Sequence, residues 1–250
     1  MGCSMHRFRR AGWLVLLLFL GVVLRVAARD FWESKPFTEW TEEEAMKMLA
    51  DSPWTRTVSV LAGTLGLDKA PEWPKDLPSL SSTGAGRQTS SLVGMAGKIS
   101  YGTTDLAPLY ISWLSSGRIR QALGRLSQLR NQVPESEVKK LLGQPTGDYQ
   151  IAIFGPLTNS FNEVSLGDLK QKTFLSSKKD KSKRIPLKSY TPPKDHSDSM
   201  AVFSFERQLN GKPVFGPEDQ EIEFDAQGKK IFLKTSFKLA KMVDGANLDF

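Results

Sequence analysis

The sequence predicts an α+β fold in which a few short helices pack against a predominantly antiparallel sheet. Apolar and polar residues alternate over 201–206, 221–225 and 231–239, which is typical of strands that bury one face. Apolar residues recur at helical spacing over 117–130, which indicates an amphipathic helix. Since no segment has the continuous apolar character of a strand buried on both faces, we expect the strands to pair antiparallel.

The aromatic stretch from Phe31 to Trp54 supplies the first element. Its rings include Trp32, Trp40 and Trp54, and burial of one aromatic side chain removes about 150–250 Å² from water. We therefore expect the stretch to dock onto the core. The functional alternative is a surface on which the three tryptophans stack against a sugar or a base.

A short helix over 42–50 has readable ends. Thr41 and Glu44 have the spacing of a capping box, and Pro53 ends the helix because the residue before a proline avoids the α region. The predicted buried stripe consists of Ala45, Met46 and Leu49, with Met48 as a further candidate.

Residues 1–28 have the organisation of a signal peptide. A basic region precedes an apolar run over 11–24, and small residues end at Ala28, where we predict cleavage. The run is shorter than the ~20 residues of a membrane-spanning helix. We expect 29–250 to be a single domain exported to the periplasm or outside the cell. The alternative is an N-terminal membrane anchor that is not cleaved, in which Arg25 snorkels to the interface.

Export changes the composition of the chain. Residues 1–28 contain four arginines, no acid and the only cysteine, so their removal lowers the formal net charge from +7 to +3, with 30 basic against 27 acidic residues. A weakly basic chain is a poor match to nucleic acid. A mature chain without cysteine excludes disulfides, thiol catalysis and thiolate metal sites.

Gly, Pro and Ser occupy 14 of the 35 positions from Gly63 to Gly97. This composition over such a length favours a flexible loop or linker. The alternative is a mobile lid or a binding loop.

The middle of the chain mixes strands and helices. We predict strands at 57–61, 109–114 and 150–154, and helices at 117–130 and 134–142. The predicted buried face of the longer helix consists of Ile119, Ala122, Leu123, Leu126 and Leu129.

Four arginines flank this apolar face, namely Arg118, Arg120, Arg125 and Arg130. Such side chains usually cover apolar surface with their stems and keep the charge in water. The functional alternative is binding to a membrane surface or to an anionic ligand.

Between 157 and 194 the pattern weakens. A short helix around Leu166 and Leu169 and a strand at 173–175 are the predicted elements. We interpret the charge run over 178–184 as a solvated hairpin tip and not as a phosphate or polyanion site.

The last part of the chain predicts an antiparallel hairpin. Gln227 and Gly228 supply its turn, between strands at 221–225 and 231–239. In the first of these strands the inward Ile222 and Phe224 alternate with Glu221, Glu223 and Asp225.

No catalytic signature stands out. After export the one remaining histidine is His196, and with Asp195 and Asp198 it offers only one imidazole and two carboxylates on a Pro-rich loop, a poor zinc site. Serine-hydrolase, phosphate-loop, dinucleotide-binding and calcium-loop motifs are absent. We predict no catalytic residue, metal or cofactor. A carboxylate pair for glycoside hydrolysis stays open, because its spacing is spatial.

Three segments, 31–54, 110–123 and 237–248, together resemble a group of uncharacterised exported proteins of environmental bacteria. The first segment reads F-W-E-S-K-P-F-T-E-W-T-E-E-E-A-M-K-M-L-A-D-S-P-W. The resemblance implies export and a single ancestral domain, and it implies no activity, cofactor or active-site residue.

We therefore expect an exported, non-catalytic binding or structural protein of the cell envelope, whose partner is an envelope protein or polymer. A secreted hydrolase with an unrecognised carboxylate site is the alternative, and a membrane binder that uses the basic helix is the third hypothesis. A hydrolase needs carboxylates with shifted pKa values in a pocket, whereas burial of all three tryptophans would remove the stacking surface. The candidate binding residues are Trp32, Trp40, Trp54, Arg118, Arg120 and Arg125.

Overall fold

The computed structural model describes residues 30–61, 106–155, 158–193, 200–229 and 231–250. These residues belong to two compact units, one that ends at Pro36 and one from Phe37 to Phe250. The segment that ends at Ala28, the Gly/Pro/Ser-rich loop over 63–97 and the loop that contains His196 all lie outside the described residues.

The described part of the first unit is the single helical turn α2 (Phe31–Ser34). The rings of Phe31 and Trp32 meet edge to face, with their centroids 5.0 Å apart. The hydroxyl of Ser34 donates a hydrogen bond of 3.0 Å to the carbonyl of Phe31.

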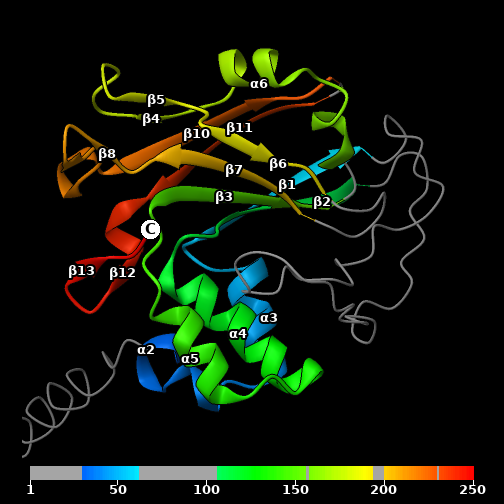
Figure 1. Ribbon diagram of the computed structural model, residues 1–250, viewed down its shortest axis with the longest axis vertical. Helices are drawn as coiled ribbons and strands as arrows, with labels where there is room; N and C mark the ends of the chain where they lie inside the picture. Colours follow the sequence, from blue (N-terminus) through cyan, green and yellow to red (C-terminus); the bar gives the residue numbers. More distant parts are fainter. Residues whose placement is uncertain (1–29, 62–105, 156–157, 194–199, 230) are drawn as a thin grey trace, which may run out of the picture. The chain divides into compact units, whose positions relative to one another are not determined.

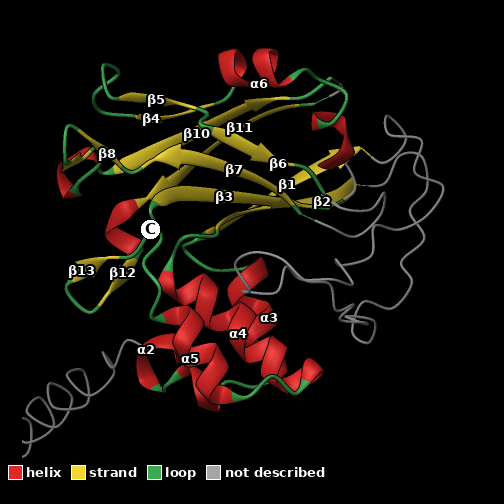
Figure 2. Cartoon of the chain, viewed as in Figure 1, coloured by secondary structure: helices red, strands yellow, loops and turns green. Residues whose placement is uncertain are grey.

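The second unit has the predicted α+β fold, and every pairing between its described strands is antiparallel (Figures 1 and 2). In the first sheet the order is β1 (Thr55–Leu61), β2 (Leu106–Trp113), β3 (Asp148–Phe154), β7 (Ala201–Glu206) and β6 (Ser189–Thr191). In the second sheet it is β11 (Phe232–Lys238), β10 (Glu221–Gln227), β4 (Phe174–Ser177) and β5 (Arg184–Pro186). Two short ribbons pair β8 (Gln208–Leu209) with β9 (Lys212–Pro213), and β12 (Val243–Asp244) with β13 (Asn247–Leu248).

The two sheets pack face to face. The ring of Phe224 on β10 lies 5.7 Å from that of Phe203 and 6.2 Å from that of Phe205, both on β7. Trp113 on β2 meets Phe237 on β11 at 5.2 Å. All five rings are buried. The alternation seen in the sequence therefore places one face of each strand in a shared aromatic core.

The two sheets are linked at both lateral sides. On one side the chain passes from β5 to β6 through a corner at which the amide of Leu187 donates to the carbonyl of Thr173 and the amide of Lys188 donates to the carbonyl of Ser204. On the other side the Nε of Arg56 donates a 2.8 Å hydrogen bond to the carbonyl of Ser236 on β11.

Three helices, α3 (Glu42–Ala50), α4 (Gly117–Asn131) and α5 (Glu135–Leu142), lie on the side of the first sheet that faces away from the second sheet (Figure 1). The fourth helix, α6 (Leu166–Lys172), lies against the second sheet on the opposite side. Short 3₁₀ turns occur at η1 (Phe37–Glu39), η3 (Thr158–Phe161), η4 (Pro217–Asp219) and η5 (Leu239–Lys241). No described helix has the length and apolar character required to cross a membrane.

The capping box of α3 is confirmed. The amide of Glu44 donates to the hydroxyl of Thr41 at 3.2 Å, and the amide of Thr41 donates to the carboxylate of Glu44 at 2.8 Å. The predicted buried stripe needs one correction, since Met48 is fully buried whereas Met46 is only half-buried. A second correction concerns α4, where Leu129 is 41% exposed and so does not belong to the buried face.

The end of the chain completes the core. The carboxylate of Asp249 accepts hydrogen bonds from the hydroxyl of Ser116 (2.7 Å) and from the amides of Gly117 (2.5 Å) and Arg118 (3.0 Å) at the N-terminus of α4. The ring of Phe250 packs at 5.4 Å from that of Trp113. This segment therefore caps a helix and fills the aromatic core at once.

The hairpin predicted over 221–239 is confirmed, with β10 and β11 paired from Glu221 with Lys238 to Gln227 with Phe232. On α5, Lys139 and Glu135 are one turn apart and form an ion pair of 2.6 Å. The sequence pattern did not reveal β5, β6 or the two ribbons, because each of these strands has only two or three residues and no periodicity can be read over that length.

Candidate functional site

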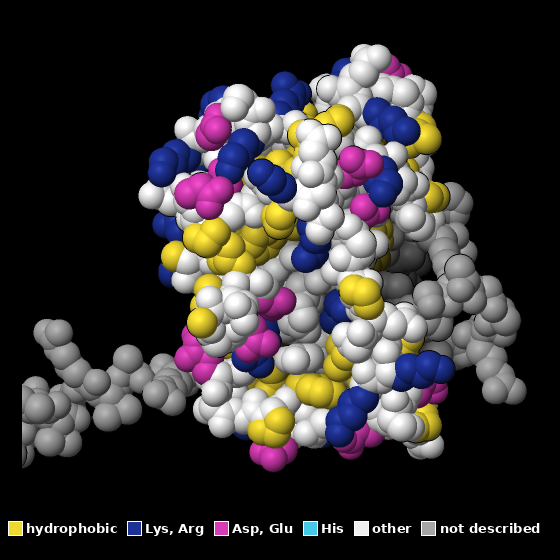
Figure 3. All heavy atoms as spheres, turned by 60° about the vertical axis from the view of Figure 1, so that its left-hand side comes forward, with side chains coloured by type: hydrophobic (Ala, Val, Ile, Leu, Met, Phe, Trp, Pro, Cys, Tyr) yellow, Lys and Arg dark blue, Asp and Glu magenta, His cyan; other side chains and the backbone are white. Residues whose placement is uncertain are grey.

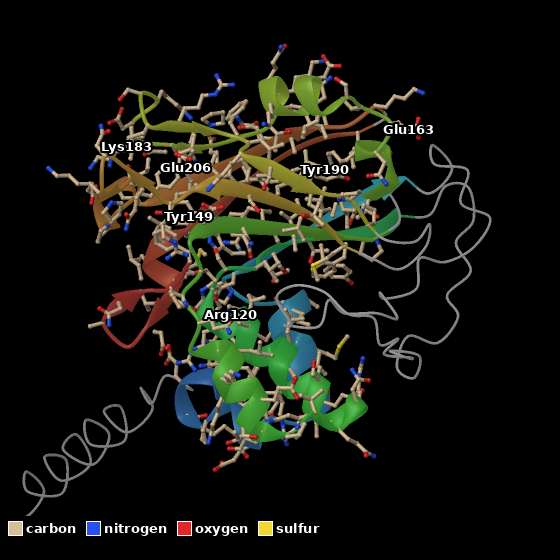
Figure 4. All side chains as sticks on the ribbon, viewed as in Figure 1. Arg120, Tyr149, Glu163, Lys183, Tyr190 and Glu206 are labelled. Carbon is tan, nitrogen blue, oxygen red and sulfur yellow. The ribbon has the colours of Figure 1, made fainter. Side chains whose placement is uncertain are left out.

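A pocket of about 570 Å³ lies between the turn that joins β4 to β5 and the 3₁₀ turn η4. All of its lining side chains are charged, and both signs are represented. They are Lys179, Asp180, Lys181, Lys183, Glu218 and Asp219. Figure 4 shows Lys183 at the end of the second sheet where this turn lies.

The turn over 178–183 is fixed by its own hydrogen bonds. The amide of Asp180 donates to the hydroxyl of Ser177 at 3.0 Å. The amide and the hydroxyl of Ser182 both donate to the carboxylate of Asp180, at 3.0 and 2.7 Å. Local bonds of this kind stabilise a tight turn. The prediction of a hairpin tip at this charge run is confirmed, because β4 and β5 pair on either side of it.

The other wall of the pocket depends on Asp219. Its side chain is only 1% exposed, and its carboxylate accepts hydrogen bonds from the amide of Gly216 (2.8 Å) and from the ammonium of Lys183 (3.0 Å). The same ammonium donates to Glu218 at 2.9 Å. Lys183 therefore joins the hairpin turn to η4, and the two walls of the pocket hold each other in place.

Further acid and lysine pairs continue from the pocket along the outer face of β10. Lys178 lies 2.8 Å from Glu221, and Lys181 is bonded to Glu223. Lys234 on the neighbouring strand lies 3.8 Å from Glu223 and 3.3 Å from Asp225. Basic and acidic side chains are interspersed on the face of the molecule that Figure 3 shows.

The ion pairs decide the protonation of these acids. The hydrogen bond from Lys183 lowers the pKa of Glu218, and the bond from Lys181 lowers the pKa of Glu223. For Asp219, burial raises the pKa, but the Gly216 amide and the Lys183 ammonium outweigh burial and the net shift is downward. These carboxyl groups are therefore ionised at neutral pH.

Two lining groups carry charges that no ion pair neutralises. Among the described residues, neither Lys179 nor Asp180 has an ion-pair partner, and both are exposed. Hydrogen bonds from Ser182 lower the pKa of Asp180, so its carboxylate is also ionised. The pocket thus offers an ammonium without an ion pair and a carboxylate whose hydrogen bonds come from Ser182 and not from a lysine.

The alternating acids of β10 are covered by other side chains. Glu223 and Asp225 are only 9% and 3% exposed. They do lie on the face opposite Phe224, but Lys181 and Lys234 fold over them as partners. The alternation of residues along a strand shows which side chains share a face. It cannot show which long side chains from other segments will cover that face.

The three candidate tryptophans form no stacking surface. Trp32 is 7% exposed, and Trp40 and Trp54 are fully buried. The indole of Trp54 donates a 2.6 Å hydrogen bond to the carbonyl of Asp249. A ring that must stack on a ligand needs an open face, so these residues belong to the folded interior.

The arginines of α4 are bonded to other segments of the chain. Arg118 pairs with Asp244 at 2.6 Å, Arg120 donates to the carbonyl of Leu141, and Arg125 donates to the carbonyl of Trp40 at 2.7 Å. The fourth, Arg130, donates to Glu42 at 2.8 Å. Figure 4 shows Arg120 on α4, away from Lys183. These guanidinium groups hold the helical layer together, which leaves little of them for a membrane or an anionic ligand.

Metal binding finds no support in the part of the chain that the structure describes, where no three acidic, histidine or cysteine side chains are placed to hold an ion. None of the six pocket residues is among the binding candidates predicted from the sequence. The only available signal was the charge run over 178–184, and it could not show that η4 lies against it.

The charges of the pocket favour binding over acid catalysis. Hydrolysis of a glycosidic bond by two carboxyl groups requires one that stays protonated, with a raised pKa. Here the pKa values of Glu218 and Asp219 are shifted the opposite way. Fixed ionised groups of both signs can instead recognise a charged ligand.

Comparisons with protein-family models, with curated proteins and with solved structures returned no match for this chain. The resemblance to exported bacterial proteins therefore stays a prediction. The function has to be inferred from the contacts, burial and charges of the pocket.

Proposed function

We propose that this protein is an exported, non-catalytic binding protein of the cell envelope and that it binds its ligand at the pocket between the β4–β5 turn and η4. The observation that carries the proposal is the state of the pocket's carboxylates. Glu218 and Asp219 are ionised and are both held by Lys183, and the side chain of Asp219 is buried. A site prepared in this way loses little entropy when a charged ligand enters.

Export is supported by the sequence of residues 1–28, with its basic start, apolar run and small residues before position 29. The choice of the pocket is supported further because the two other candidate binding surfaces, the tryptophans and the arginines of α4, serve the packing of the protein. The tryptophans are buried, and the arginines of α4 have partners within the chain.

A secreted hydrolase remains the alternative because three carboxylates, those of Asp180, Glu218 and Asp219, line one pocket. The lowered pKa values of these groups leave no proton donor among the three at neutral pH. A hydrolase would therefore need a different acid.

The test is recovery of the protein from solubilised envelope fractions, followed by mass spectrometry of the material that it retains. The informative variant combines Lys179→Gln with Glu218→Gln. It removes one charge of each sign from exposed positions of the pocket and leaves the net charge unchanged. The matched control combines Glu137→Gln with Lys170→Gln, which are exposed residues of α5 and α6 outside the pocket lining.

We expect the wild type and the control to retain the same component, and the pocket variant to retain at least about fivefold less, because each lost ion pair is worth up to ~1 kcal/mol. Equal retention by all three proteins would contradict the proposal. Conversion of the retained component by the wild type would favour the hydrolase.

A further inference from the structure

Some charges of the pocket are not neutralised by ion pairs within the protein, and they indicate the class of ligand. This inference rests on the proposed function and extends it. Lys178 is balanced by Glu221, and Lys181 and Lys234 together are balanced by Glu223 and Asp225. Lys183 is held by two carboxylates, so this group has one negative charge in excess.

Two further charges of the pocket are not part of an ion pair. Lys179 contributes an ammonium and Asp180 a carboxylate, and neither has an ion-pair partner among the described residues. The pocket therefore presents one uncompensated positive charge and two uncompensated negative charges to a ligand.

We propose that the pocket binds a small ligand with one carboxylate and two amino groups, as in a free basic amino acid. The ligand's carboxylate pairs with the ammonium of Lys179. Its amino groups pair with Asp180 and with Glu218, whose side chain is 63% exposed and within reach of solvent. The volume of about 570 Å³ is in the range of small-molecule sites.

The same charges exclude simpler ions. A phosphate or other plain anion that approaches Lys179 also meets the two uncompensated negative charges, and a plain diamine meets the ammonium of Lys179. Repulsion of the wrong partner contributes to specificity as much as attraction of the right one does.

The experiment is a titration of the isotope-labelled full-length protein followed by NMR of backbone amides. The probes are L-lysine, cadaverine, which is L-lysine without its carboxylate, and inorganic phosphate. We expect L-lysine to shift amides of 178–183 and 216–219 saturably, and to bind about fivefold more tightly than cadaverine or phosphate, because each of these lacks one class of ion pair.

Three variants assign the contacts. Lys179→Gln should weaken L-lysine binding about fivefold and leave cadaverine no weaker, whereas Glu218→Gln should weaken both. Lys170→Gln on α6 is the matched control and should change neither. A tripeptide that ends in lysine tests the second amino group, because the α-nitrogen of its last residue is an uncharged amide: it should bind more weakly than L-lysine, and tighter binding would contradict the two amino contacts.

Tighter binding of phosphate than of L-lysine would overturn the inference, as would shifts confined to residues outside the pocket. Failure of the inference and failure of the proposed function are distinguishable. If no probe binds but the double variant of Lys179 and Glu218 still loses its envelope component, the ligand class is wrong and the binding site stands. If L-lysine binds but retention is unaffected, the envelope function is wrong.

Discussion

Asp249 shows at the residue scale how one side chain can organise distant segments. Its carboxylate accepts hydrogen bonds from Ser116, Gly117 and Arg118 at the start of α4, and its carbonyl accepts one from the indole of Trp54. Charge-assisted bonds at a helix N-terminus are among the stronger polar contacts in proteins.

We predict that Asp249→Ala lowers the free energy of unfolding by about 2–4 kcal/mol, because the helix amides lose a charged acceptor. Urea titration measures the change. Asp244→Asn is the control, since Asp244 forms only a half-exposed pair with Arg118, and it should cost less than about 1 kcal/mol. Equal effects of the two substitutions on the free energy of unfolding would contradict a stabilising role for the Asp249 cap.

The ion pairs around the pocket predict how stability depends on pH. The folded pKa values of Glu218, Glu221 and Glu223 lie below their ordinary value, so these pairs add stability above about pH 4, and the contribution is lost as pH falls through the folded pKa values. The pKa of Lys183 is raised by Glu218 and Asp219, so its contribution is lost only as pH rises above about 10.4.

We therefore expect a stability plateau between about pH 6 and pH 9, with a decline on either side. Lys183→Gln should make the acid decline shallower, because Glu218 and Asp219 lose the ammonium that favours their ionised form. Thermal unfolding over a pH series measures the profile. A profile for Lys183→Gln with the same acid slope as that of Lys170→Gln would contradict this assignment.

At the scale of single elements, Gly155 fixes the end of β3. Its backbone has φ +129°, and a Cβ atom there would lie 2.9 Å from the carbonyl oxygen of Pro108 and 3.2 Å from the Cα of Leu109. Only glycine fits both the conformation and the close approach of β2.

Gly155→Ala should lower the free energy of unfolding by about 1–3 kcal/mol, because both the backbone conformation and the contact become unfavourable. Gly147→Ala is the matched control, since a Cβ atom at that position meets nothing within 4 Å; its effect should stay within about 0.5 kcal/mol. Denaturant titration of the two variants decides the matter. A neutral Gly155→Ala would show that β2 and β3 can separate freely at this point.

The elements that could be predicted are those with a long pattern or a local cap. Thr41 and Glu44 gave the start of α3 because a capping box is decided within four residues. The hairpin of β10 and β11 followed from the alternation over 221–225 and 231–239. Strand β5 could not be found in this way, since its pairing depends on β4 and not on its own three residues.

At the scale of the whole unit from Phe37 onward, the two sheets are joined through aromatic contacts. The ring of Phe224 packs against the rings of Phe203 and Phe205, and it is fully buried. The sequence indicated which face of each strand is apolar. It could not indicate that these strands belong to two sheets, because the order of strands is a long-range property.

Phe224→Ala should lower the free energy of unfolding by about 3–5 kcal/mol through lost burial and a cavity between the sheets. Phe232→Ala is the control, since that ring is 64% exposed, and its effect should stay below about 0.5 kcal/mol. Chemical unfolding monitored by circular dichroism provides both values. Similar values for the two variants would be inconsistent with a core shared by the two sheets.

The candidate site is also a property of the whole unit, and this explains why the sequence missed it. Lys183 and Asp219 are 36 residues apart along the chain and meet at 3.0 Å. The charge run could be seen in the sequence, whereas the buried acid that fixes it could not. The tryptophans and arginines were conspicuous by type, yet their bonds and burial assign them to packing.

Hydrogen exchange of backbone amides, with and without the material that the protein retains from envelope fractions, locates the binding site before the ligand is known. Binding at the pocket between the β4–β5 turn and η4 predicts slower exchange in 178–183 and 216–219. The variant that combines Lys179→Gln with Glu218→Gln should show none of this protection. Protection concentrated instead in α4 or around Trp40 and Trp54, and unchanged in that variant, would contradict binding at the pocket.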